Sequence, residues 1–162
     1  EPFGVANALL KPAACILGYT LSDYVFMNGA QTDTDELGRR LFEMSNFAFT
    51  GEKQPGSDRL TEISPARQVS KNTPPTFLWA TAGDRLVPSQ HSTLMATALA
   101  NAGVPFEIHI FEEGDHGLAL ADQSTAMTTG QLNADAAKWM PLCEAWLNKR
   151  FKLDLPDKTG WE

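Results

Sequence analysis

An aspartate and a histidine with complementary chemistry each follow an apolar run in this 162-residue sequence. Asp84 comes just after the run 75–82, and His116 comes shortly after the run 106–112. Neutral imidazole takes and returns a proton efficiently near pH 7. A carboxylate that holds the Nδ1–H of such a ring completes two thirds of a nucleophile-activating triad. The sequence therefore predicts Asp84 as a catalytic acid and His116 as a catalytic base.

Predicted strands and a helix would bring these two side chains together. Residues 76–82 and 106–112 are typical of strands, and 89–102 has the apolar spacing of a helix packed on a sheet. A right-handed crossover makes such strands parallel neighbours, and open parallel sheets bind ligands at their carboxyl edge. The run 12–19 predicts another strand, buried on both faces. We therefore expect an α/β fold, a parallel sheet of three or more strands with flanking helices.

The segment 20–72 is longer than one crossover connection needs. Residues 19–31 indicate a loop, 32–49 a helix with an apolar face, and 59–69 a short helical turn. We favour packing of that apolar face on the sheet. The alternative is that 20–72 forms a lid or pocket wall, with the apolar side chains facing a substrate. Those side chains are Phe42, Met44, Phe47 and Phe49.

Other side chains near the predicted strands have simpler interpretations. Asp23 and Tyr24 follow the first strand and could line a pocket, although a capping loop is favoured. His91 is expected to be exposed in the first turn of its helix. His109, inside a strand, is interpreted as structural, and Asp115 as a turn former. These residues leave Asp84 and His116 as the catalytic candidates.

Composition narrows the classes of function. A net charge of −7 without a lysine or arginine cluster argues against nucleic acid and against an anionic membrane surface. No apolar run approaches the roughly 18 residues of a membrane span. We expect no cofactor and no metal site, since His, Cys and carboxylates form no cluster at metal-ligand spacing. Cys15 and Cys143 are interpreted as buried, inert thiols. A final amphipathic helix is predicted over 139–151, and the chain is expected to form a single, partial domain over 1–162.

Five segments in order resemble the C-terminal half of an α/β-hydrolase, near acetyl xylan esterase-like and lipase-like carbohydrate esterases. They are Ser64-Pro65, Thr73-Pro-Pro-Thr-Phe-Leu-Trp79, Ala82-Gly-Asp-Arg-Leu-Val-Pro88, Ala102-Gly-Val-Pro105 and Gly114-Asp-His-Gly117. The resemblance implies a triad in the order nucleophile, acid, histidine, with Asp84 and His116 in the last two places. The Gly-x-Ser-x-Gly elbow and the upstream oxyanion loop of that family are absent here. The chain is therefore similar to the later half of such an enzyme, and we expect the serine to lie outside it.

The resemblance implies a serine esterase that acts on small acyl esters, with acetylated sugars as the first candidates. A prolyl-oligopeptidase-like peptidase and a dienelactone-hydrolase-like enzyme are alternatives. A further alternative is a non-catalytic fragment or binding remnant, because the chain has no nucleophile of its own. Exposed sheet edges would also favour self-association. The expected partner is a small-molecule ester, and the sequence assigns no acyl group, alcohol, cell compartment or oligomeric state.

Overall fold

The computed structural model describes residues 4, 10–30 and 36–152, and a parallel sheet lies at its centre. Its three strands within these residues are β1 (Cys15–Gly18), β2 (Thr76–Thr81) and β3 (Phe106–Phe111), in the order β1-β2-β3. Both pairings are parallel, with Gly18 opposite Trp79 and Trp79 opposite His109. The predicted α/β sheet is confirmed, and so is the crossover that makes β2 and β3 neighbours.

The middle strand differs from the two outer strands in burial. Every residue of β2 is buried, because this strand has a neighbour on each side and a helix over each face. β1 is shorter than the predicted run 12–19, and its Ile16 is 46% exposed. The prediction that this strand is buried on both faces is therefore wrong for the described residues, where β1 has a partner along one edge.

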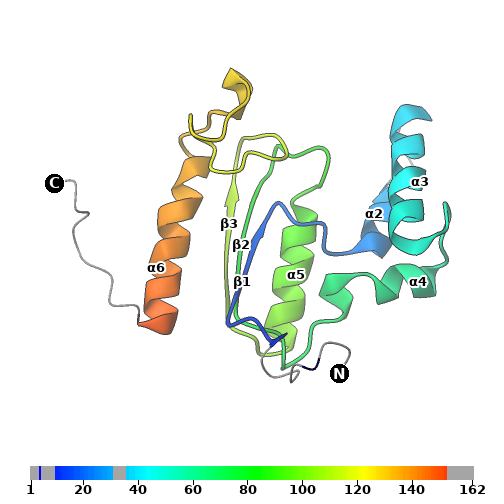
Figure 1. Ribbon diagram of the computed structural model, residues 1–162, viewed down its shortest axis with the longest axis horizontal. Helices are drawn as coiled ribbons and strands as arrows, with labels where there is room; N and C mark the ends of the chain where they lie inside the picture. The colour runs from blue at the N-terminus through cyan, green and yellow to red at the C-terminus, as the bar shows by residue number, and fades with distance from the viewer. Residues whose placement is uncertain (1–3, 5–9, 31–35, 153–162) are drawn as a thin grey trace.

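Two helices cover opposite faces of the sheet, α5 (Gln90–Asn101) and α6 (Trp139–Phe151), as Figure 1 shows. Side chains of β2 alternate between the two layers. The core consists of Ala66, Leu78, Met95, Ala96, Leu99 and Val104 on the α5 side, and of Phe77, Trp79, Leu118, Ala121, Ala136, Cys143 and Trp146 on the α6 side. The predicted final helix is confirmed. Within the described residues no helix is both long and apolar enough to cross a membrane.

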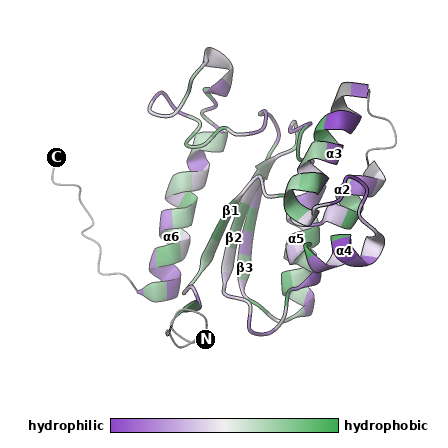
Figure 2. Ribbon diagram, turned by 45° about the vertical axis from the view of Figure 1, so that its right-hand side comes forward, coloured by the Kyte–Doolittle hydropathy of each residue, from purple (hydrophilic) through white to green (hydrophobic). Residues whose placement is uncertain are grey.

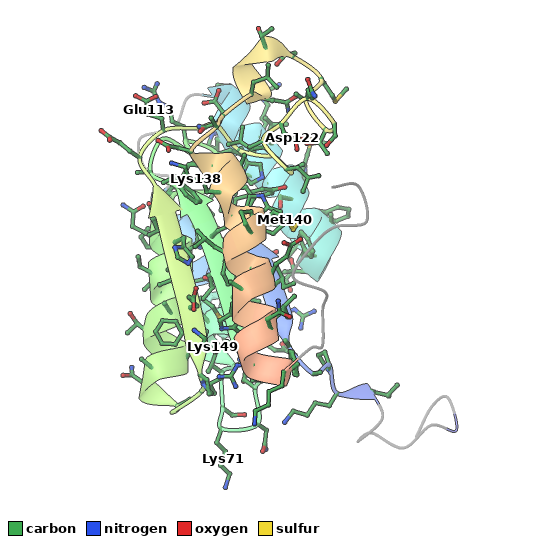
Figure 3. All side chains as sticks on the ribbon, turned by 90° about the vertical axis from the view of Figure 1, so that its left-hand side faces the viewer. Lys71, Glu113, Asp122, Lys138, Met140 and Lys149 are labelled. Atoms are coloured by element: carbon green, nitrogen blue, oxygen red, sulfur yellow. The ribbon has the colours of Figure 1, made fainter. Side chains whose placement is uncertain are left out.

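The two ends of the sheet are easily told apart in Figure 3, which looks onto α6. Glu113 and Asp122 lie at the end where β3 finishes, and Lys71 lies at the opposite end. The chain after β3 runs through loops and two 3₁₀ helices, Thr129–Gln131 and Ala136–Lys138, before α6 begins. This segment therefore forms part of the sheet's carboxyl edge.

The segment between β1 and β2 contains α2 (Tyr24–Ala30), α3 (Glu36–Thr50), α4 (Ser57–Glu62) and the 3₁₀ helix Pro65–Arg67. The predicted loop over 19–31 is therefore wrong in its second half. Oδ1 of Asp23 accepts the backbone N–H of Phe26 at 2.9 Å, so Asp23 caps the helix that follows it. The predicted start of the next helix, at residue 32, lies outside the described residues.

Helix α3 leaves much of its apolar face in solvent. α2, α3 and α4 lie on the α5 side of the sheet and further out than α5 (Figures 1 and 2). Met44 is 67% exposed, Phe47 56% and Phe49 62%. The favoured prediction, that this face packs on the sheet, is therefore wrong, because α5 already occupies that side of the sheet.

Candidate active site

Asp84 and His116 form a hydrogen bond at the carboxyl edge of the sheet. Oδ2 of Asp84 lies 2.8 Å from Nδ1 of His116. The Asp84 side chain has no exposed surface, whereas that of His116 is 29% exposed. The structure thus brings together the two side chains that the sequence predicts as acid and base, and their catalytic role stays a prediction.

The loop after β2 holds the Asp84 carboxylate through its other oxygen. Oδ1 accepts the backbone N–H groups of Leu86 and Val87, each at 2.9 Å. Such bonds are typical of an aspartate that begins a turn. One carboxylate oxygen thus holds the turn and the other contacts the imidazole of His116. Three hydrogen bonds therefore fix this carboxylate.

The loops after β2 and β3 approach each other backbone to backbone. A Cβ on Gly83 would lie 3.0 Å from the carbonyl oxygen of Gly114. Gly114 has a φ of 138°, and a Cβ there would lie 2.8 Å from the side chains of Thr81 and Leu118. The hydroxyl of Thr81 also donates to the Gly114 carbonyl at 2.7 Å. Glycine is needed at both positions for this close approach, which sets the separation of Asp84 and His116.

The hydrogen-bond pattern assigns the tautomer of neutral His116. A carboxylate accepts hydrogen bonds, so the ring proton lies on Nδ1 and the lone pair on Nε2. Within the described residues Nε2 has no hydrogen-bond partner. The arrangement can therefore accept a proton at Nε2 from a neighbouring nucleophile while Asp84 holds and stabilises the imidazolium.

Sequence reasoning missed Tyr19 as a neighbour of His116. The two ring centroids are 4.9 Å apart, with the planes at 69°. Tyr19 directly follows β1, whose carboxyl end lies at the same edge of the sheet as those of β2 and β3. The position of Tyr19 just after a predicted strand was therefore the sequence feature that could have placed it near His116.

His91 was predicted to be exposed, but it is completely buried. The backbone N–H of Asp23 donates to its Nδ1 at 3.3 Å, and its Nε2 lies 3.4 Å from Sδ of Met27. The hydroxyl of Ser22 donates to the His91 carbonyl at 2.6 Å. Burial lowers the pKa of His91, and the charges of Asp23 and Asp84 oppose this only in part. The prediction failed because α2 packs over the first turn of α5, a contact that local sequence does not reveal.

Asp23 belongs to this buried region. Its Oδ2 accepts a hydrogen bond from Nε of Arg67 at 2.9 Å. Burial raises the pKa of Asp23, but the Arg67 guanidinium and the backbone N–H groups of Phe26 and Val25 together lower it. The favoured prediction for Asp23 and Tyr24, a capping loop, is wrong for Tyr24, because this residue begins α2.

His109 has a structural environment on β3. Its Nε2 lies 3.1 Å from Oε1 of Glu107, whose other oxygen accepts a hydrogen bond from Lys149 at 3.0 Å. Lys149 lies along α6 in Figure 3. In the part of the chain that the structure describes, no group of three or more His, Cys, Asp or Glu side chains could hold a metal ion.

Comparisons with solved structures find hydrolases. A carboxylesterase from Lactobacillus plantarum has a TM-score of 0.67 at 30% identity, covering 90% of this chain and 47% of its own. A sugar hydrolase from Lactococcus lactis has a TM-score of 0.70 at 27% identity, covering 93% and 53%. An acetyl ester-xyloside bifunctional hydrolase from Caldicellulosiruptor lactoaceticus has a TM-score of 0.61 at 35% identity, and the match covers 85% of this chain and 42% of that protein. The chain thus spans about half the length of these proteins.

Sequence comparisons place the chain in a family. Among curated proteins, endo-1,4-beta-xylanase B of Butyrivibrio fibrisolvens is 43% identical over 68 residues, which are 42% of this chain and 11% of that protein. The family description that matches residues 7–141 is the prolyl oligopeptidase family. The α/β-hydrolase resemblance is confirmed by the solved neighbours, and the chain belongs to the prolyl oligopeptidase family.

Proposed function

We propose that this chain supplies the acid and the histidine of a serine carboxylesterase that acts on small acyl esters, with acetylated sugars as the leading substrates. The observation that carries the proposal is the 2.8 Å hydrogen bond from Nδ1 of His116 to a fully buried Asp84 carboxylate at the carboxyl edge of the sheet. The names of the solved neighbours, a carboxylesterase and an acetyl ester-xyloside hydrolase, support the ester and sugar parts.

The proposed reaction has two steps. A serine outside this chain attacks the ester carbonyl while Nε2 of His116 takes the serine proton. The tetrahedral intermediate collapses, the acyl–oxygen bond breaks, and His116 gives the proton to the departing alcohol. Water then attacks the acyl-serine with His116 as base, and the acid is released as the serine is protonated. Asp84 keeps its negative charge throughout and stabilises the imidazolium.

We also propose that α2, α3 and α4 form a lid or pocket wall, as the sequence offered for 20–72. The exposed Met44, Phe47 and Phe49 of α3 support this, because apolar side chains are rarely grouped in solvent without a role. Replacing Phe47 by serine is expected to raise KM for long acyl esters more than for acetyl esters.

Two other functions remain as alternatives. The family match favours a peptidase that cleaves next to proline, and the same acid and base would serve it. The absence of Gly-x-Ser-x-Gly from the 162 residues favours a non-catalytic fragment or binding remnant. For the chain alone, the exposed Ile16 on β1 supports self-association through the sheet edge, which analytical ultracentrifugation would detect as a rising mass with concentration.

The first experiment compares substrates on the full-length product of the gene that encodes this chain, after its intact mass is measured. We expect hydrolysis of p-nitrophenyl acetate and acetylated xylobiose, and little cleavage of a proline p-nitroanilide. His116→Ala should lose at least about 10³-fold in kcat, whereas the matched control His109→Ala should stay within about threefold. Preferential cleavage of the anilide would favour the peptidase. Turnover unaffected by His116→Ala would contradict the assignment of the base.

A further inference from the structure

One hydrogen bond does not fix the orientation of an imidazole ring. Asp84 holds Nδ1 of His116, but the ring can still swing about that bond and carry Nε2 out of line with a nucleophile. The His116 ring is partly exposed, and the solvent on its exposed side does not restrain its orientation. A second contact on the ring is therefore needed, and the structure provides it in Tyr19, whose ring meets His116 edge to face at 4.9 Å.

Tyr19 is itself held rigidly. Its backbone N–H donates to the Trp79 carbonyl at 2.7 Å. Its ring also meets the Trp79 ring edge to face, with centroids 5.1 Å apart at 84°. The Trp79 indole is stacked on Trp139 at 5.1 Å and 10°. A Cβ on Gly18 would lie 2.8 Å from Nε1 of Trp79, so glycine before Tyr19 leaves room for that indole.

The backbone of Tyr19 is in an unfavourable conformation. Its φ is +38°, in the left-handed region that bulky residues rarely adopt. Such strain persists only where the surrounding structure enforces it, often at functional sites. Here it turns the aromatic ring from the end of β1 toward the loop that carries His116.

We propose that Tyr19 is a positioning residue, whose ring holds the imidazole of His116 in the orientation that directs Nε2 at the nucleophile. This inference rests on the proposed function for its catalytic consequence, and on the ring contact for its structural one. The Tyr19 ring, and not its hydroxyl, restrains the His116 ring, because in the described residues the hydroxyl makes no hydrogen bond. Phenylalanine should therefore replace tyrosine.

The test uses Tyr19→Ala, Tyr19→Phe and the matched control Phe111→Ala. Phe111 also meets the Trp79 ring, at 6.4 Å and 69°, but its described ring contacts do not include His116. In the full-length protein, Tyr19→Ala should lower kcat for p-nitrophenyl acetate about 10- to 100-fold with KM within twofold, because small misplacements of reacting groups are costly. Tyr19→Phe and Phe111→Ala should stay within about threefold.

A second measurement separates this inference from the proposed function. In the full-length protein, ¹³C relaxation of the His116 ring, which does not depend on ester turnover, should show greater ring motion in Tyr19→Ala, and wild-type motion in Tyr19→Phe and Phe111→Ala. Unchanged ring motion in a folded Tyr19→Ala protein would overturn the positioning role. The positioning role would also be overturned if Phe111→Ala increased the motion of the His116 ring as much as Tyr19→Ala does. Absence of ester turnover in the wild type would instead count against the proposed function and leave the relaxation result to decide the role of Tyr19.

Discussion

His116 and His91 lie in two regions of the same molecule and are held in opposite ways. The Asp84 carboxylate accepts a hydrogen bond from Nδ1 of His116, while the Asp23 backbone N–H donates one to Nδ1 of His91. The proton of neutral His116 is therefore on Nδ1, and that of neutral His91 is on Nε2. Nε2 of His116 carries a lone pair at the sheet edge that accepts no hydrogen bond from the described residues, whereas Nε2–H of His91 points at the sulfur of Met27 in the core.

This difference shows that the partner of Nδ1 decides what a histidine can do. A ring with a carboxylate on Nδ1 presents a base to its surroundings, and its charged form is stabilised. A ring with a donor on Nδ1 presents an N–H, and protonating it would break an existing hydrogen bond in a buried site. The first arrangement suits catalysis, and the second suits packing.

The largest expected effect comes from removing the charge that defines the His116 arrangement. Asp84→Asn can donate from its amide to Nδ1, which would move the ring proton to Nε2 and make His116 resemble His91. We expect kcat for ester hydrolysis to fall by about 10⁴-fold. ¹⁵N spectra of the imidazole should report the change of tautomer. A variant that keeps the Nδ1–H tautomer and most of its activity would contradict the comparison.

The second effect concerns stability at His91. Replacing His91 by alanine leaves a cavity and an unpaired Asp23 N–H, so the free energy of unfolding should fall by about 2–4 kcal/mol. Urea denaturation measures this loss. The control is His116→Ala, which removes a partly exposed ring and should cost less. Equal losses in the two variants would mean that the two sites do not differ as described.

The pH dependence of stability sharpens the same contrast. Because burial lowers the pKa of His91, the unfolded chain binds a proton below about pH 6.5 while the folded chain does not. The free energy of unfolding should therefore fall as pH decreases from about 6.5 toward the folded pKa of His91. His91→Gln should flatten this part of the curve relative to His116→Gln. An unchanged slope in His91→Gln would assign the pH dependence to another group.

The sequence allowed the sheet and the pairing of side chains at its carboxyl edge to be predicted, because both depend on local patterns. One contiguous stretch of the chain contains the apolar strands before Asp84 and His116, the helix between them and the glycines of their loops. The parallel topology then places both strand ends at the same edge of the sheet. The pairing of Asp84 with His116 then follows from two strand ends that must lie side by side.

The errors concern contacts between segments far apart in the chain. Burial of His91 depends on α2, which the sequence indicated as a loop because the cap supplied by Asp23 was not recognised. The position of the Tyr19 ring depends on a left-handed φ, which cannot be predicted from a tyrosine at that position. The exposed face of α3 has the period of a packed helix, and amphipathic spacing alone does not reveal that α5 already fills the sheet face.

The smallest expected effect tests whether the His91 region is held from outside. Arg67 is 39% exposed in its side chain, so its ion pair with the buried Asp23 should contribute about 1 kcal/mol or less. Since the pKa of Asp23 is lowered overall, its ionised form adds stability above the unfolded pKa of about 4, and this is lost as pH falls. Arg67→Gln should therefore reduce stability at pH 7 and weaken the loss at acid pH.

Arg59→Gln provides the matched control, because Arg59 pairs with the exposed Glu62 on one helix turn. It should change the free energy of unfolding less than Arg67→Gln does. ¹⁵N spectra of His91 should also shift in Arg67→Gln and not in Arg59→Gln, since Asp23 carries both the carboxylate held by Arg67 and the N–H that meets Nδ1 of His91. If His91 signals stay fixed in both variants, packing by α2 alone keeps that ring in its neutral form, and the contrast with His116 does not need the Asp23 ion pair.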